Sequence, residues 1–178
     1  AKCMQSILED LLSLSRLESG DLSEKSGGRL NAATILRQIS GDMQKTVALD
    51  THNIVLEIDD TLALRAVESE FNSLAVNLIR NAIRHTPEGT SIQIIWQRME
   101  DGRACLSISD DGPGIEAAHL PKLTDRFYRV DTSRSRDSGG TGLGLSIVKH
   151  IMQRHGGSLH IESEPGNGAT FTACFPAF

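Results

Sequence analysis

Apolar residues recur at every third or fourth position in several stretches of the chain, and this spacing predicts amphipathic helices. The stretches are residues 1–19, a segment that begins at an N-capping Asn31 and runs to about Val47, residues 68–85 and residues 143–155. A shorter helix is predicted over residues 116–126. Thr86-Pro87-Glu88-Gly89 and His155-Gly156-Gly157 supply stop signals for two of these helices.

Apolar and polar residues alternate elsewhere, which predicts strands over 54–58, 62–64, 92–96, 104–108, 159–161 and 171–175. Asp101-Gly102 predicts a hairpin between two of these strands, and Gly166-Asn167-Gly168 predicts a second hairpin near the end of the chain. Strands and helices in this order predict an α+β fold, a two-layer sandwich whose helices stack on one face of an antiparallel-rich sheet.

The first predicted helix carries a broad stripe of leucines and other apolar residues and ends at Ser19-Gly20. So short a helix is marginal alone, so it needs a partner, either its own domain or another copy of the chain. The chain starts inside this helix, and we therefore expect a fragment of a longer protein. Residues 21–29 are polar and contain Gly27-Gly28, which predicts a linker.

Composition restricts the function classes. A chain of 178 residues with 39% hydrophobic and 23% charged residues is typical of a soluble globular protein. The net charge of −5 argues against a nucleic-acid partner. Cys3, Cys105 and Cys174 are odd in number and lack metal-ligand spacing, so we expect free thiols in a reducing cytosol. No apolar run is long enough for a transmembrane helix.

Glycines alternate over residues 139–144, directly before the last predicted helix. Glycine lets the backbone approach a ligand closely, and the first turn of a helix presents free N–H groups, so this stretch predicts an anion site that suits phosphate. No Gly-Lys-Ser/Thr follows, which excludes a P-loop, and Ile147 replaces the last glycine of a dinucleotide fingerprint. A tight loop remains an equal alternative for the glycine cluster alone.

The predicted helix over 68–85 has four polar residues along the border of its apolar face: Asn77, Asn81, Arg84 and His85. Asparagine is disfavoured in helix interiors, so two asparagines spaced by four residues on one helix suggest a functional role. Amide oxygens suit a Mg²⁺ ion shared with phosphates, and the two basic residues suit the phosphates or a sugar. A polar helix edge that faces water is the alternative.

Two loops carry further candidate chemistry. In Asp110-Asp111-Gly112-Pro113-Gly114-Ile115, a carboxylate at a strand end can accept a hydrogen bond from an exocyclic amine, and glycines let a flat ring such as adenine lie close. A simple turn explains the same residues. Arg126-Phe127-Tyr128-Arg129 precedes a basic, serine-rich stretch that ends at residue 139, which suits either a lid over phosphates or a solvated surface loop.

Together and in this order, these stretches resemble the ATP-binding domain of sensor histidine kinases, within the superfamily of gyrase, heat-shock chaperones, histidine kinases and MutL. The segment from Asn77 to Pro87 resembles the N box, 110–115 the G1 box, 126–129 the F box and 140–145 the G2 box, with a weaker match of 164–171 to the last glycine box. Residues 1–20 resemble the second helix of the dimerisation hairpin, which leaves 21–29 as linker and 30–178 as the ATP-binding domain of Bergerat type.

The resemblance implies a site for ATP and Mg²⁺. Asn81 would hold the metal with Asn77 nearby, Asp110 would bind the adenine amine, and Gly112, Gly114 and Ile115 would shape the base pocket. The sugar and phosphates would meet Arg84, His85, Tyr128, Arg129, Gly140, Thr141, Gly142, Leu143, Gly144 and Leu145, with 129–139 as the lid. Ala169 departs from the threonine that the family often has beside adenine.

The resemblance also implies phosphoryl transfer to a histidine and then to an Asp of a response-regulator receiver domain, in a homodimeric sensor whose cytosolic part this chain would be. None of the six histidines is followed by Glu or Asp, so the phosphoacceptor, and with it any catalytic residue, is expected to lie on a missing hairpin helix. The superfamily's ATPases have Glu where this chain has Asn77, and an amide cannot act as a general base. A related ATPase or serine kinase, or a non-catalytic docking module gated by nucleotide, are the alternatives.

Overall fold

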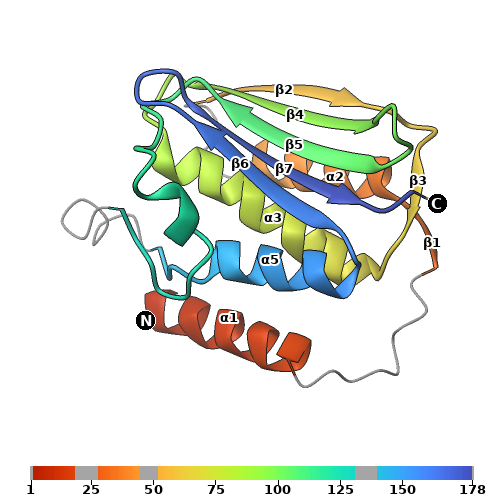
Figure 1. Ribbon diagram of the computed structural model, residues 1–178, viewed down its shortest axis with the longest axis horizontal. Coiled ribbons are helices and arrows are strands. Elements are labelled where there is room, and N and C mark those ends of the chain that lie inside the picture. The colour runs from red at the N-terminus through yellow and green to blue at the C-terminus, as the bar shows by residue number, and fades with distance from the viewer. Residues whose placement is uncertain (1, 19–27, 45–51, 131–139, 178) are drawn as a thin grey trace.

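The computed structural model describes residues 2–18, 28–44, 52–130 and 140–177, and within them an open sheet lies over a layer of helices (Figure 1). The sheet has five strands in the order β2-β4-β5-β7-β6. Their bounds are Asn53–Ile58 for β2, Ser91–Arg98 for β4, Ala104–Asp110 for β5, Ser158–Ser163 for β6 and Ala169–Phe175 for β7. Helices cover one face of this sheet only, which confirms the predicted two-layer α+β sandwich.

Strand pairing follows the predicted hairpins. β4 pairs with β5 and β6 pairs with β7 in antiparallel register, and β5 pairs with β7 in the same sense, while β2 runs parallel to β4. The β5–β7 register sets Asp110 opposite Ala169. β5 and β7, which belong to different hairpins, therefore pair in the middle of the sheet, and the end of β5 lies beside the start of β7.

The helical layer consists of α2 (Ala32–Gln44), α3 (Glu68–His85) and α5 (Gly144–Arg154), and all lie close to their predicted positions. The N-capping prediction for Asn31 is confirmed, because its Oδ1 accepts a hydrogen bond from the Thr34 N–H at 3.4 Å. Phe71 of α3 lies fully buried under the sheet, with its ring centroid 5.6 Å from that of Trp96 and 5.8 Å from that of Phe175. These aromatic contacts fix α3 against the central strands.

The first helix, α1 (Lys2–Glu18), packs against α5 on the side away from the sheet (Figure 1). Leu14 is buried there, and Glu18 forms an ion pair with Arg126. Leu8, Leu11 and Leu12 are exposed by 58%, 41% and 50%. The helix thus uses its own domain as a partner and leaves part of its leucine stripe uncovered.

A short strand, β1 (Arg29–Asn31), pairs antiparallel with β3 (Ala63–Arg65) in a separate two-stranded sheet. Most of the predicted linker, 21–27, lies outside the described residues. The prediction of a short helix over 116–126 is wrong. Residues 116–126 form turns around a single 3₁₀ turn, η2 (Leu120–Lys122), and not an α-helix. Proline at residue 121 has no N–H to donate, which disfavours a continuous helix through this segment.

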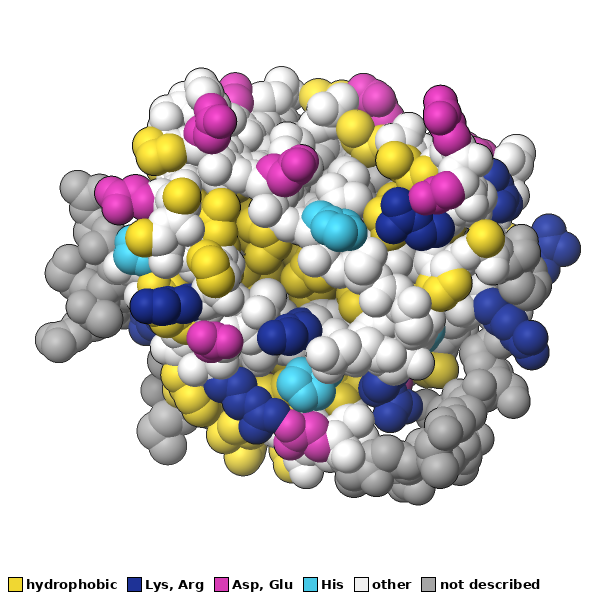
Figure 2. Space-filling view, viewed as in Figure 1, with side chains coloured by type: hydrophobic (Ala, Val, Ile, Leu, Met, Phe, Trp, Pro, Cys, Tyr) yellow, Lys and Arg dark blue, Asp and Glu magenta, His cyan; other side chains and the backbone are white. Residues whose placement is uncertain are grey.

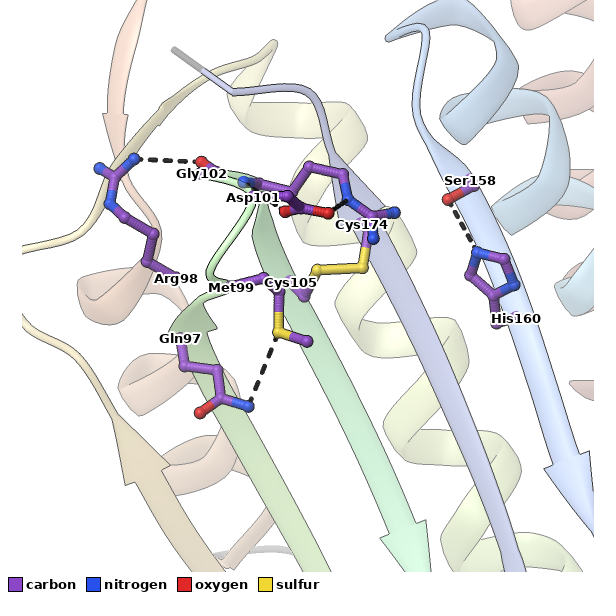
Figure 3. Close-up of polar contacts among 10 residues, drawn as sticks. Gln97, Arg98, Met99, Asp101, Gly102, Cys105, Ser158, His160 and Cys174 are labelled. Atoms are coloured by element: carbon purple, nitrogen blue, oxygen red, sulfur yellow. Dashed lines mark hydrogen bonds and ion pairs between the residues drawn. A yellow bond between two sulfur atoms is a disulfide. The ribbon is translucent and has the colours of Figure 1, made fainter.

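The prediction of free thiols is also wrong, because Cys105 and Cys174 form a disulfide with their Cα atoms 4.1 Å apart. The two residues face each other in the antiparallel β5–β7 register, on the side of the sheet that bears no helices (Figure 3). Both cysteines are nearly fully buried. The disulfide therefore ties together the two central strands of the sheet. Cys3 carries no described side chain.

Acidic and basic side chains are interspersed over the face of the molecule seen in Figure 2, with hydrophobic side chains between them. Among the described residues, no helix combines the length and the apolar character that a membrane span requires.

Candidate functional site

A cavity of about 400 Å³ opens at one end of the helical layer, between the C-terminal half of α3, the loop after β5 and the segment that leads into α5. These segments lie together at the left of Figure 1, although up to about sixty residues of sequence separate them. A cavity of this size is typical of sites for small molecules. Its walls combine apolar side chains with a few convergent polar groups.

The polar edge of α3 forms one wall, with Asn77, Asn81, Arg84 and His85 all at the cavity. The Asn77 Nδ2 donates to the Ser73 carbonyl one turn earlier at 2.9 Å, which fixes the orientation of the amide. The Asn77 Oδ1 then faces Gly144, where an added Cβ would lie only 2.8 Å from this oxygen. The helix and the glycine segment before α5 thus approach each other as closely as a residue without a side chain allows.

The opposite wall begins at Asp110, the last residue of β5. Its Oδ1 accepts a hydrogen bond from the Gly112 N–H at 3.0 Å, and a Cβ at Gly112 would come within 2.8 Å of the same oxygen. Burial raises the pKa of Asp110 above its ordinary value, against the hydrogen bonds from the Gly112 and Ala169 backbones that lower it. A half-buried carboxylate whose charged form is disfavoured at a cavity wall is a candidate for ligand binding.

The hairpin between β6 and β7 supports the Asp110 loop from behind. The Ser163 hydroxyl donates to the Gly168 carbonyl at 2.6 Å and accepts from the Ile115 N–H at 2.8 Å. An added Cβ at Gly168 would lie 1.8 Å from the Asp110 carbonyl oxygen, and one at Gly114 would lie 2.0 Å from the backbone carbonyl oxygen of Glu164. The two glycine loops are therefore packed backbone against backbone.

Positive charge gathers on the α3 side of the cavity. Arg84 and Arg129 both lie near Gly140, where an added Cβ would be 3.5 Å and 3.8 Å from their guanidinium nitrogens. Burial, with help from these two charges, lowers the pKa of His85 below its ordinary value and so favours the neutral imidazole. Because each of these groups gains from a nearby negative charge, this wall suits an anionic ligand.

A strained backbone segment completes the rim. Phe127 adopts a φ of 62°, and its N–H donates to the Gly142 carbonyl at 2.9 Å. Gly142 has a φ of 72°, and a Cβ there would lie 2.8 Å from the Phe127 Cα. The next residue, Tyr128, lines the cavity, and its hydroxyl lies 2.7 Å from His119 Nδ1. Left-handed backbone at a residue with a side chain is uncommon and tends to mark functional sites.

A family profile described as "Histidine kinase-, DNA gyrase B-, and HSP90-like ATPase" matches residues 66–178, which include every wall described above. The chain belongs to this family. The phosphate regulon sensor protein PhoR of Pseudomonas aeruginosa is 44% identical over 174 residues, which are 97% of this chain and 38% of that protein. PhoR of Haemophilus influenzae is 36% identical over 97% of this chain and 40% of its own length.

A solved structure matches more of the chain than the family profile does. The crystal structure of full-length ShkA in complex with AMPPNP superposes with a TM-score of 0.80 at 24% identity, covering 97% of this chain and 35% of that one. The family and these relatives identify the chain as the ATP-binding domain of a sensor histidine kinase. It spans well under half the length of the curated relatives described here.

Most of the residues that the sequence assigns to the ATP-binding site of this kinase domain line this cavity. They are Asn77, Asn81, Arg84, His85, Asp110, Gly114, Ile115, Tyr128, Arg129, Gly140, Thr141, Gly142, Gly144 and Leu145. Two do not line it: Leu143 is fully buried in the core, and Gly112 is buried between Thr86 and Asp110. Of the predicted lid, 131–139 lies outside the described residues.

Sequence reasoning missed several residues at the kinase site. Asp10 of α1 lines the cavity, and its Oδ2 accepts a hydrogen bond from the Thr141 hydroxyl at 2.7 Å. Ser163 and His119 contact Ile115 and Tyr128, which line the cavity. Ala169, which the resemblance already places beside adenine, lines the cavity together with Asp110. Only Ser163 carried a usable signal, because it precedes a glycine loop at a strand end. Asp10 pairs across 131 residues, a distance that no local pattern covers.

Metal-binding capacity in the kinase site rests on amides. Within the described ranges, no cluster of three or more His, Cys, Asp or Glu residues is arranged to hold a metal ion. The oxygens available from the α3 wall belong to Asn77 and Asn81. Neutral amide oxygens are acceptable Mg²⁺ ligands when substrate phosphates supply the negative charge.

Proposed function

We propose that this chain binds ATP with Mg²⁺ in the cavity and, within a longer homodimeric sensor kinase, supplies the γ-phosphoryl group to a histidine and thence to a response-regulator Asp. The main support for the proposal is the position of Asp110, because its carboxylate lines the same cavity as the α3 amides and the glycine segment 140–145. We further propose that residues 1–20 are the second helix of the dimerisation hairpin, with 21–29 as linker and 30–178 as the ATP-binding domain.

Adenine binding falls to Asp110 in this proposal. The carboxylate accepts a hydrogen bond from the exocyclic amine, and Gly112 leaves the space that this approach needs, since a Cβ there would crowd the Asp110 oxygen. Gly114 and Ile115 border the base, and Ala169 lies where a larger side chain would add a contact. Because Asp110 binds as a hydrogen-bond acceptor, the ionised form is the one that functions.

Phosphate binding falls to the opposite wall. The backbone N–H groups at the start of α5, together with Arg84, Arg129 and His85, offer donors and positive charge to a triphosphate. Asn81 offers an amide oxygen to Mg²⁺, and the bound ion would neutralise phosphate charge. The cradle fits this ligand set, because a side chain at Gly144 would fill the space in front of Asn77.

Asn77 favours transfer over hydrolysis. Its Nδ2 is engaged with the Ser73 carbonyl, so the amide presents only an oxygen to the cavity and has no group that accepts a proton from water at neutral pH. Asn77 therefore lies beside the phosphates without activating water. Catalysis then consists of positioning and charge neutralisation, with the imidazole nucleophile brought from outside this domain.

Calorimetric titration of MgATP into the chain, and into Asp110→Asn, tests the proposal. Asp111→Asn is the matched control, because the neighbouring carboxylate points away to the Ser91 N–H at 2.7 Å and does not line the cavity. We expect binding by the parent and by Asp111→Asn, and loss of at least tenfold in affinity by Asp110→Asn. A parent with a cooperative melting transition and no heat of ATP binding contradicts the proposal.

Transfer is tested next by supplying a dimerisation hairpin that carries the phosphoacceptor histidine. Acid-labile phosphate on the hairpin, dependent on both ATP and this chain, is the expected result. ATP binding without transfer would favour the alternative of a nucleotide-gated docking module, and release of free phosphate without transfer would favour a related ATPase.

A further inference from the structure

Tyr128 is the only tyrosine in the chain, and it lines the cavity. The segment that carries it is held at its start, because the Phe127 N–H donates to the Gly142 carbonyl and the Tyr128 N–H donates to the Asp125 carbonyl at 3.3 Å. The backbone thus fixes where the Tyr128 side chain begins. A phenol ring still has two rotatable bonds, so its far end needs a contact of its own to stay against the cavity.

His119 provides that contact. Its Nδ1 lies 2.7 Å from the Tyr128 hydroxyl, and the ring centroids are 6.2 Å apart with a tilt of 46°. The His119 backbone is fixed by successive turns, since its N–H donates to the Glu116 carbonyl at 2.9 Å and its carbonyl accepts from the Lys122 N–H at 3.0 Å. The imidazole therefore stands on an anchored piece of the loop after β5, and not on the segment that carries Tyr128.

We propose that His119 is a positioning residue for nucleotide binding: its Nδ1 holds the Tyr128 hydroxyl so that the phenol ring stands as a preformed wall of the ATP site. This inference rests on the proposed function of the cavity. His119 itself does not line the cavity, so it acts through Tyr128. A ring ordered before the ligand arrives does not lose its rotational freedom on binding, which raises affinity without any added contact.

The size of the effect follows from the single hydrogen bond involved. A neutral hydrogen bond contributes about threefold to tenfold to an equilibrium constant. His119→Leu removes the bond, and Tyr128→Phe removes it from the other side while keeping the ring. We expect each variant to weaken MgATP binding by about threefold to tenfold, and the double variant to be no weaker than either single one, because both changes delete one interaction.

A conservative variant separates positioning from mere support of the loop. The amide of His119→Asn can place a polar atom near the position of Nδ1, so we expect it to restore most of the affinity that His119→Leu loses. His160→Leu is the matched control, because His160 lies on the edge strand β6 beside Ser158 (Figure 3) and does not line the cavity. Its affinity should equal that of the parent.

The single tyrosine allows a direct readout. With ring-labelled tyrosine, NMR shows one set of signals from Tyr128, which we expect to be dispersed in the free parent and in His119→Asn and to move on addition of ADP. In His119→Leu the free-state signals should shift toward those of an unstructured tyrosine, while the melting temperature stays within a few degrees of the parent.

Several outcomes overturn the inference while leaving the proposed function intact. One is a parent that binds MgATP together with a His119→Leu variant of equal affinity and unchanged tyrosine signals. Additive losses in the double variant, or an Asn variant as weak as the Leu variant, also contradict it. If the folded parent does not bind MgATP, the proposed function itself fails, and the inference fails with it.

Discussion

Replacing Gly168 by alanine tests how closely the last glycine loop holds the Asp110 strand end. The added Cβ would lie 1.8 Å from the Asp110 carbonyl oxygen, 2.8 Å from its carbonyl carbon and 3.0 Å from the Asp111 Cα. All three are backbone atoms, so no side-chain rotation relieves the clash. Gly166→Ala is the matched control, because it shares the positive φ, +85° against +74°, and has no atom within 4 Å of its Cβ.

The comparison separates two costs. Both variants place alanine in left-handed backbone, which costs about 1 kcal/mol or somewhat more. Gly168→Ala adds overpacking against backbone, of order 1–3 kcal/mol, so its total loss is roughly 3 kcal/mol. At about 2–4 °C per kcal/mol for a chain of this size, we expect Gly166→Ala to melt a few degrees below the parent and Gly168→Ala roughly 10 °C below it.

The same clash predicts a functional loss. The Asp110 backbone must retreat by roughly 1 Å or more, and a misplacement of that size weakens a positioned contact strongly. We expect calorimetry to show MgATP affinity unchanged in Gly166→Ala and reduced at least about tenfold in Gly168→Ala, measured at a temperature where both are folded. Equal melting temperatures and equal affinities in the two variants would refute the close packing of the two loops.

Other predictions follow from single contacts. Because the pKa of His85 is lowered, its imidazole is neutral at pH values between that lowered pKa and its ordinary value of about 6.5, and it should take up a proton when anionic phosphates bind in this pH range. Calorimetry just below pH 6.5, in two buffers of different ionisation enthalpy, should detect the uptake, and His85→Gln should abolish it. Gly144→Ala should reduce MgATP affinity with little loss of stability, since its Cβ meets only a side chain, whereas Gly41→Ala, in open helical space, should raise stability by up to about 1 kcal/mol. Reduction of the Cys105–Cys174 disulfide should destabilise the fold by about 2–4 kcal/mol, which thermal scans with and without a thiol reductant should detect as a lower melting temperature. The affinity for MgATP should stay within about twofold of the parent's, because Cys105 lies at the opposite end of β5 from the cavity.

Local patterns predicted those parts of the fold in which local sequence decides the structure. The helix α3 follows from its apolar face and its stop at Thr86-Pro87, and the β4–β5 hairpin follows from alternation around Asp101-Gly102. The strand β1 could not be read in this way. It has three residues, and it exists because it pairs with β3 more than thirty residues later in the chain.

The disulfide shows the same limit for chemistry. Three cysteines in the sequence do not say which two meet, and only the β5–β7 register sets Cys105 opposite Cys174. The site behaves similarly. The sequence predicted Asn77 from its place on a helix edge and Asp110 from its place at a strand end. It did not predict Asp10, whose partner Thr141 lies 131 residues away, or His119, whose contact with Tyr128 forms within an irregular loop.

The location of the site also follows from where the chain tolerates unfavourable features. Phe127 is the only residue other than glycine with a positive φ in the described part of the chain, and it lies on the cavity rim against Gly142. Positive φ alone does not mark a site, because Gly89 and Gly166 adopt it in turns with open space around them. At the cavity the same backbone conformation coincides with approaches that exclude any side chain, and with a carboxylate, Asp110, whose pKa burial raises. Unfavourable backbone angles, contacts that exclude side chains and a half-buried carboxylate thus occur together at the cavity. This is expected where selection acts on binding and the rest of the fold supplies the compensating stability.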